Sequence, residues 1–298
     1  MVCFLSSLLN RGKDRRLLYS YFESPFQPPS RQNLGIPQMG DTCLIDPHPT
    51  VILFLSRPLA GSLCQMIEVV QTGQAGKTKL LFDMHRLRKR VFADRMKWPV
   101  TIVSNDLEID QFDLPETVYL LCLNKDGKVV GNWRLLATTG PTMIRDVWPE
   151  FLFTLPMPTD QFVWEASRFA VESNTEEPEE RVRQLNEFTA ELFCALTELS
   201  ILCGIREIYT LYDMRIARLL KRLDCEPVYV SEKRKIGDYL VQTGVFRTDA
   251  DMLSRIQKKT GLRGYLINQD DLPPLLDNLR HANTYRTLRE GNTSYARQ

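Results

Sequence analysis

Charged residues in or beside otherwise apolar stretches are the part of this sequence best suited to chemistry. Burying a charge is costly unless an opposite charge accompanies it, so buried charges occur in pairs or clusters. Three arginines and three carboxylates are candidates: Arg88, Asp110, Asp113, Arg134, Glu165 and Arg168. We expect their charges to offset one another in one cluster. Scattered surface charges are the alternative, but Arg134 and Glu165 interrupt apolar strands, which makes a solvated position less favourable for them.

Four segments must bring these side chains together. Apolar residues spaced by three to four predict a helix over 79–96, which carries the first arginine. An irregular acidic stretch over 105–116 holds the two aspartates. Two apolar runs, 117–124 and 129–136, flank Lys-Asp-Gly-Lys, and the Asp-Gly pair predicts a β-hairpin between them.

The following part of the chain alternates strands with helices. Strands are predicted over 162–171, 207–211 and 227–230, and helices over 179–203 and 213–223. The inner face of the longer helix is expected to comprise Val182, Leu185, Phe188, Leu192, Leu196 and Leu199. Consecutive strands followed by alternating strands and helices are typical of an α/β (α+β) domain, in which helices flank a mixed sheet.

The two ends of the chain differ from its middle. Residues 1–65 hold 7 of the 17 prolines and show no sustained period, which predicts a disordered extension or a mis-called start. A strand beginning at Met66 marks the start of the folded domain, expected over 66–262. A helical and polar tail is predicted over 263–298, with a helix start near 270–274.

The composition argues against several classes of protein. A formal net charge of +1 disfavours nucleic-acid binding, because phosphate recognition usually leaves a basic excess. No stretch approaches the roughly 18 apolar residues of a membrane span. Seven cysteines without Cys-x-x-Cys or Cys/His ligand spacing indicate reduced, cytoplasmic thiols and neither a disulfide framework nor a metal site. With three histidines, His-based nucleophilic catalysis is hard to assemble, and His85 is expected at the surface or in packing.

The charged residues belong to four sequence blocks. The blocks are Arg88 followed by Phe92 and Trp98, Glu108-Ile-Asp110-Gln-Phe-Asp113, Trp133-Arg134-Leu-Leu-Ala137-Thr-Thr-Gly140-Pro141, and Trp164-Glu165-Ala-Ser167-Arg168-Phe169. In these blocks the sequence resembles the acyl-homoserine-lactone synthases, or autoinducer synthases. All eight positions of that family's signature are present: Arg88, Phe92, Trp98, Asp110, Asp113, Arg134, Glu165 and Arg168. Ala137 stands where the family usually has proline, and the similarity runs from Met66 to about Gly261.

The resemblance implies a fold and a reaction. The fold would resemble the N-acetyltransferase sheet, in which splayed parallel strands leave a cleft for the thioester arm of the acyl donor. The reaction would join an acyl group to S-adenosylmethionine, a substrate and not a tightly bound cofactor, and release a lactone and methylthioadenosine. Glu165 is the expected proton acceptor, and the other five charged residues would form the network that organises it. Phe92 and Trp98 would help form the S-adenosylmethionine pocket, with core packing as the alternative.

The resemblance also implies partners. The donor would be an acyl-carrier protein or acyl-CoA, and no pyrophosphate loop of the acetyl-CoA type is found, which favours the carrier. Four cations on the helix over 213–223 would dock an acidic carrier, with a solvated face as the alternative: Arg215, Arg218, Lys221 and Arg222. Thr210 would line the acyl-chain pocket. Two other functions stay open: another acyl-CoA-dependent N-acyltransferase of this fold, or a non-catalytic S-adenosylmethionine-binding regulatory module.

Overall fold

A computed structural model describes residues 64–269, 272–281 and 283. The predicted N-terminal extension falls outside the described residues up to 63, and the first strand, β1 (Cys64–Gln71), begins two residues before Met66. Asp270 and Asp271 of the predicted helix start are also outside them, and the helix that follows is described over 274–281. No helix within the described ranges is long and apolar enough to cross a membrane.

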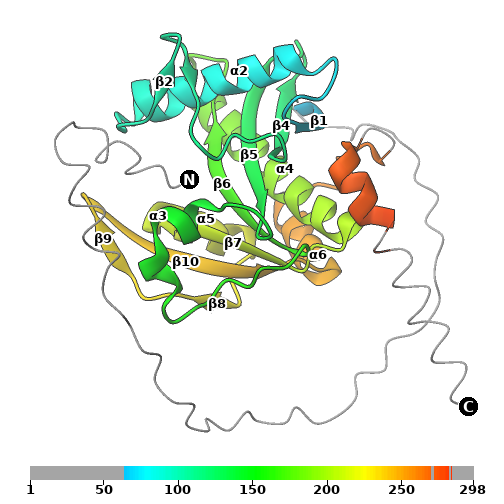
Figure 1. Cartoon of the computed structure of the whole chain (residues 1–298). Helices are drawn as coiled ribbons and strands as arrows, with labels where there is room; N and C mark the ends of the chain where they lie inside the picture. The colour runs from blue at the N-terminus through cyan, green and yellow to red at the C-terminus, as the bar shows by residue number, and fades with distance from the viewer. Residues whose placement is uncertain (1–63, 270–271, 282, 284–298) are drawn as a thin grey trace, which may run out of the picture.

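One mixed sheet of eight strands runs through the domain (Figure 1). Its order is β1-β4-β5-β6-β7-β10-β8, and β9 also pairs with β10. Among these pairings only β6 with β7 is parallel. The strands beyond β1 are β4 (Val118–Asn124), β5 (Val129–Ala137), β6 (Val163–Val171), β7 (Glu207–Asp213), β8 (Tyr229–Val230), β9 (Arg234–Ile236) and β10 (Tyr239–Arg247). The predicted mixed sheet and the β4–β5 hairpin are confirmed, and Gly127 turns the hairpin with a φ of +70°.

Helices cover both faces of the sheet. The helices and the small second sheet are α2 (Thr78–Arg88), the π-helix η1 (Lys89–Arg95), β2 (Ile102–Val103), β3 (Leu107–Glu108), α3 (Met143–Val147), the 3-10 helix η2 (Pro149–Leu152), α4 (Pro178–Cys203), α5 (Met214–Leu223) and α6 (Ala250–Thr260). The helices α4, α5 and α6 pack on one face and enclose the largest apolar core. On the other face, α2 covers the β1–β4–β5 end and α3 covers the β7–β10 end (Figure 1), each with a smaller core of its own.

Several elements differ from the sequence-based expectation. The helix predicted over 79–96 changes from an α-helix to a π-helix at Lys89. Val182 was expected to face the core but is 59% exposed, because residues 178–187 of α4 extend past the core and burial begins at Phe188. The strands β9 and β10 and the helix α6 were not predicted. The described part of the tail also packs against the domain, since Ile267, among others, is buried in the main core.

The two parallel strands separate along their length. Pairing between β6 and β7 covers three residue pairs and ends with Glu165 opposite Tyr209. Beyond it, the Thr210 hydroxyl donates to the Ala166 carbonyl oxygen at 3.0 Å. The strands continue separately to Val171 and Asp213, so the expected splay of the sheet is confirmed and the fork begins directly after Glu165.

Candidate active site

Arg88 is fully buried at the end of α2 and bonds two carboxylates. Its Nη1 and Nη2 donate to Oδ1 and Oδ2 of Asp113 at 2.7 and 3.0 Å, and its Nε donates to Glu108. Paired N–H donors match the two oxygens of a carboxylate, which makes such contacts strong and directional. The acidic loop is therefore fixed to the helix that covers it.

Arg134 and Arg168 complete the network from the sheet. Arg134 Nη1 donates to Asp110 Oδ1 at 2.5 Å and to Asp113 Oδ1 at 3.3 Å. Arg168 Nε donates to Glu108 Oε1 at 3.1 Å, and its Nη2 donates to Asp110. Both guanidinium groups are buried. Three cations thus meet three carboxylates, and the cluster contacts both smaller cores, since Arg134 lies over Phe112 of one and Arg168 over Phe92 of the other.

The third carboxylate of this network is Glu108, where Glu165 was expected. Glu108 is fully buried in β3 and bonds both Arg88 and Arg168. The sequence contained a sign of this role. Glu108 stands two residues before Asp110, and side chains two residues apart in an extended segment point to the same side. The sequence interpretation placed the segment in an irregular loop and gave Glu108 no role.

A bulge in β6 aims Arg168 at the network. The pairing register between β5 and β6 shifts here, and Arg168 has a φ of +54°, a left-handed conformation that is costly for a residue with a side chain. Ala166 packs toward α4 before the bulge and Phe169 does so after it, so the alternation of faces changes by one residue. Arg168 consequently shares a face with Ser167, which accepts a bond from Arg134 Nε at 3.2 Å.

Burial and pairing move the pKa values of the network in different directions. Although burial opposes it, Arg88 and Arg134 hold the pKa of Asp113 well below its usual range. Burial raises the pKa of Glu108 to about 7, against the attraction of Arg88. Burial also lowers the pKa of Arg168 to about 9, which leaves it a cation at neutral pH. Next to the network, burial and the Arg88 charge lower the pKa of half-buried His85 to about 4, so His85 is neutral.

Glu165 lies on the same face of the sheet but bonds differently. It is fully buried, and its Oε2 accepts the backbone N–H of Ile144 at 2.8 Å. Its Oε1 is buried and has no hydrogen-bond partner within the described part of the chain. Burial raises the pKa of Glu165 to about 7, with the Ile144 bond acting in the lowering direction. A carboxylate with such a pKa next to the strand fork can accept a proton near neutral pH.

Phe92 and Trp98 stack on each other close to the network. Their ring centroids lie 5.3 Å apart at an interplanar angle of 2°, and both side chains are buried in the α2 core. The backbone N–H of Trp98 donates to the backbone carbonyl of Phe92 at 2.8 Å, and the Arg168 guanidinium lies 5.9 Å from the centroid of the Phe92 ring. The pair therefore packs as core in this structure while forming one wall next to the charged cluster.

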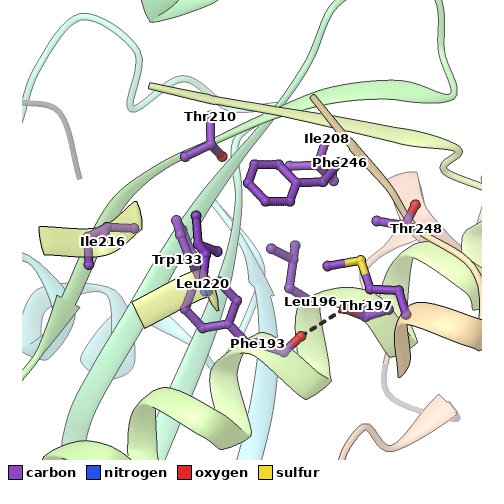
Figure 2. Close-up of a pocket in the computed structure, with 11 residues that line it drawn as sticks. Trp133, Phe193, Leu196, Thr197, Ile208, Thr210, Ile216, Leu220, Phe246 and Thr248 are labelled. Carbon is purple, nitrogen blue, oxygen red and sulfur yellow. Dashed lines mark hydrogen bonds between the residues drawn. The ribbon is translucent and has the colours of Figure 1, made fainter. Parts of the chain in front are cut away.

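An apolar pocket lies on the other face of the sheet, between α4, α5, α6 and the strands β5, β7 and β10 (Figure 2). Its walls are Trp133, Phe193, Leu196, Thr197, Ile208, Thr210, Ile216, Leu220, Phe246, Thr248 and Met252. The hydroxyls of all three threonines donate to backbone carbonyls, so they add little polarity to the wall. In Figure 2, Thr210 and Thr248 lie on opposite sides of the Ile208 and Phe246 side chains. Thr210 bonds Ala166 at the fork, so the pocket begins where β6 and β7 separate.

The four cations of α5 are not equivalent. Arg215 donates to Asp213 Oδ2 at 2.5 Å and lies 4.8 Å from the Tyr239 ring centroid, so it is engaged within the domain. Arg218, Lys221 and Arg222 are exposed, and no ion pair of theirs occurs among the described residues. The latter three are the cations of α5 that can meet another molecule.

Comparisons with known proteins agree with this geometry. Residues 73–256 match the family model of the autoinducer synthases. A probable acyl-homoserine-lactone synthase of Sinorhizobium fredii (strain NBRC 101917 / NGR234) is 31% identical over 193 residues, covering 65% of this chain and 92% of that protein. An acyl-homoserine-lactone synthase of Rhizobium radiobacter is 36% identical over 177 residues, covering 59% and 82%.

Solved structures show the same fold. The crystal structure of the acyl-homoserine-lactone synthase LasI is 28% identical, with a TM-score of 0.56, and the match covers 68% of this chain and 98% of that chain. The CoA-dependent synthase BjaI, solved with S-adenosylmethionine and isopentyl-CoA, is 20% identical with a TM-score of 0.60, covering 72% and 98%, and supports the fold alone. Because the family match spans more than half of the chain, this protein belongs to the autoinducer synthase family and is an acyltransferase enzyme.

Proposed function

We propose that this enzyme transfers an acyl group from a thioester to the amine of S-adenosylmethionine and then closes a homoserine lactone. The observation that carries the proposal is Glu165, a buried carboxylate with a pKa of about 7 at the fork between β6 and β7. The charged network lies on its face of the sheet, and the apolar pocket opens on the other. The fork is where a thioester reaching through the sheet meets a substrate held on the network face.

The reaction follows from this arrangement. Glu165, directly or through a water, takes a proton from the α-amino group, and the freed nitrogen attacks the acyl carbonyl carbon. The carbon–sulfur bond of the thioester breaks, and the donor leaves as a thiol. Backbone N–H groups along the separated strands stabilise the oxyanion formed on the way. The methionyl carboxylate then attacks its own γ-carbon, the bond from that carbon to the sulfonium breaks, and methylthioadenosine departs with its sulfur neutral.

Binding roles follow the two faces of the sheet. The stacked Phe92 and Trp98 wall the S-adenosylmethionine site, where an aromatic face attracts a sulfonium. Arg88, Arg134 and Arg168 hold the acidic loop beside that site. The acyl chain occupies the apolar pocket, past Thr210. Residues 66–262 are the catalytic domain in this proposal, and S-adenosylmethionine is a substrate and not a resident cofactor.

A carrier protein is the favoured donor on charge. The exposed Arg218, Lys221 and Arg222 on α5 suit the acidic surface of an acyl-carrier protein. A free helix N-terminus attracts phosphate, but the segment entering α4 carries glutamates, including Glu179 and Glu180 in its first turn. That charge disfavours the diphosphate of acyl-CoA there.

One assay tests the function and separates the alternatives. Purified enzyme is incubated with S-adenosylmethionine and a panel of acyl-carrier and acyl-CoA thioesters, and released methylthioadenosine is measured. Release that depends on the thioester supports the proposal. Thioester consumption with another amine indicates a different N-acyltransferase, and binding of S-adenosylmethionine without turnover indicates a non-catalytic module.

Charge reversal on α5 tests the donor. The double variant Lys221→Glu, Arg222→Glu should raise KM for acyl-carrier protein and leave KM for S-adenosylmethionine unchanged, because these side chains are exposed and outside the network. Exposed Arg183→Glu on α4 is the control, since its cation is already paired with Glu180. An equal effect of both variants on carrier KM would contradict docking at α5.

A further inference from the structure

The side chain of Arg145 is engaged with the loop that precedes its own helix. Arg145 lies on α3, and its Nη1 donates to the Thr138 carbonyl at 3.0 Å and to the Gly140 carbonyl at 3.3 Å. One guanidinium nitrogen of α3 therefore bonds two carbonyls of the loop 138–142, which leads from β5 into α3. The side chain is half-buried, and its Nη2 is buried without a hydrogen-bond partner in the described part of the chain.

Thr138 is in turn fixed to the strand that carries Glu165. Its N–H donates to the Val163 carbonyl at 3.0 Å, two residues before Glu165. Its hydroxyl bonds Asp160 twice, donating to the carbonyl and accepting from the N–H, each at 3.0 Å. The loop is thus anchored to the start of β6 at one end and closed by Arg145 at the other.

The helix α3 contacts both halves of the candidate active site. The Ile144 N–H donates to Glu165 Oε2 at 2.8 Å. The sulfur of Met143, one residue earlier, lies 3.6 Å from Arg168 Nη1 and 4.0 Å from Arg134 Nη2. Displacing α3 would therefore disturb the proton acceptor and the network together.

We propose that Arg145 is a positioning residue that holds α3 so that the Ile144 N–H stays aimed at Glu165. The contacts form a closed ring from β6 through Thr138 and Arg145 to Ile144 and back to Glu165 on β6. Among the described residues, the hydrogen bonds of Arg145 go to the Thr138 and Gly140 carbonyls and not to a network carboxylate or to a wall of the apolar pocket. The proposal rests on the proposed role of Glu165 in acyl transfer and adds a residue outside the eight signature positions.

The consequence for catalysis has a definite sign. Burial raises the pKa of Glu165 to about 7, and three groups that stabilise its charged form act in the lowering direction: the Ile144 N–H, the Arg134 cation and the Ser167 hydroxyl. Loss of the Ile144 bond shifts the pKa of Glu165 upward. Because the reaction needs the charged carboxylate, the midpoint of the pH–rate curve moves to higher pH with the pKa of Glu165. At neutral pH a smaller fraction of Glu165 is charged, so kcat falls.

The test compares Arg145→Ala with Arg145→Lys. We expect Arg145→Ala to lower kcat roughly 10- to 100-fold, the cost of misplacing a catalytic group by about 1 Å. Its pH–rate midpoint should move above that of the parent, and kcat should fall by a larger factor than KM for S-adenosylmethionine rises. Arg145→Lys keeps a donor for the two carbonyls and should recover most of the rate and the parental midpoint. The matched control is Arg206→Ala, which removes an exposed guanidinium that bonds Asp160 next to the same loop. This variant should leave both kcat and the pH–rate midpoint unchanged.

A second readout does not depend on turnover. The amide NMR signal of Ile144 should titrate with a midpoint near 7 in the parent, because its N–H bonds Glu165, and this titration should be absent in Glu165→Gln. Arg145→Ala should weaken it or move it to higher pH. An unchanged Ile144 titration and pH–rate midpoint in Arg145→Ala would overturn the proposal, as would equal losses in the alanine and lysine variants. A parent enzyme that releases no methylthioadenosine would instead refute the proposed function, and the amide titration would still test the positioning.

Discussion

Asp113→Asn removes one charge from the arginine–carboxylate network and keeps the shape of the side chain. The Asp113 carboxylate accepts hydrogen bonds from both terminal nitrogens of Arg88, from Nη1 of Arg134 at 3.3 Å and from the Tyr119 hydroxyl at 2.7 Å. Its side chain is 3% exposed. The amide offers one oxygen acceptor where the carboxylate offers two, so the buried Arg88 guanidinium keeps Glu108 but loses the charge of its other carboxylate partner.

The same loop and helix provide a matched control. Asp106 bonds Arg86 Nε at 2.8 Å, but the two side chains are 47% and 45% exposed. Breaking a buried pair costs about 3–5 kcal/mol, whereas an exposed pair contributes about 0–1 kcal/mol. At roughly 2–4 °C per kcal/mol for a domain of this size, Asp113→Asn should lower Tm by about 6–20 °C and Asp106→Asn by no more than about 4 °C.

The pH dependence of the effect has a sign fixed by the lowered pKa of Asp113. A depressed folded-state pKa adds stability above the unfolded pKa, about 4 for aspartate, and that stability is lost as pH falls through the folded value. The gap in unfolding free energy between the parent and Asp113→Asn should therefore be full at pH 7 and narrow below about pH 4.

Urea unfolding followed by tryptophan fluorescence measures these differences, since Trp98, Trp133 and Trp164 are buried. Combining Asp113→Asn with Arg88→Met should cost less than the sum of the single variants by about 1–3 kcal/mol, because both remove the same contact. Equal losses for Asp113→Asn and Asp106→Asn, together with additive single effects, would refute the network as a buried, mutually neutralised unit.

Three further predictions concern other sites. Glu165→Gln should reduce methylthioadenosine release by about 100-fold or more and abolish the rise in rate through pH 7, because the amide cannot accept the proton; a retained rise would contradict its role. Glu198 accepts the N–H groups of Leu266 and Ile267, and burial raises its pKa to about 7, so its stability contribution is lost as pH rises through that value. Glu198→Gln should therefore gain Tm relative to the parent at pH 8 and not at pH 4; a pH-independent difference would contradict this. Leu196→Trp should fill the apolar pocket and lower kcat/KM for long acyl donors more than for short ones. The larger side chain should also lower the free energy of unfolding by about 1–3 kcal/mol. An equal loss of kcat/KM for all chain lengths would argue against binding of the acyl chain in this pocket.

Local patterns in the sequence predicted much of the fold. The Asp-Gly pair determined the hairpin between β4 and β5, since few turns suit two closely spaced strands. Apolar spacing located α4 and α5 within a residue or two. Apolar spacing did not show where along α4 the core ends, so the prediction put Val182 on the buried face of the helix although its side chain is exposed. Burial depends on what packs against a helix, and that information is not local.

The sequence also determined the family and most of the charged residues, because their types and spacing form a signature. Only the tertiary structure decided which charges pair. Glu108 and Glu165 are both buried carboxylates, yet the fold brings Glu108 to Arg88 and Arg168 and leaves Glu165 bonded to the Ile144 N–H. Such partners lie 20 to 60 residues apart along the chain, so spacing cannot choose between them. The bulge that turns Arg168 toward the network and the pocket completed by β10 and α6 likewise arise from pairing and packing between distant segments.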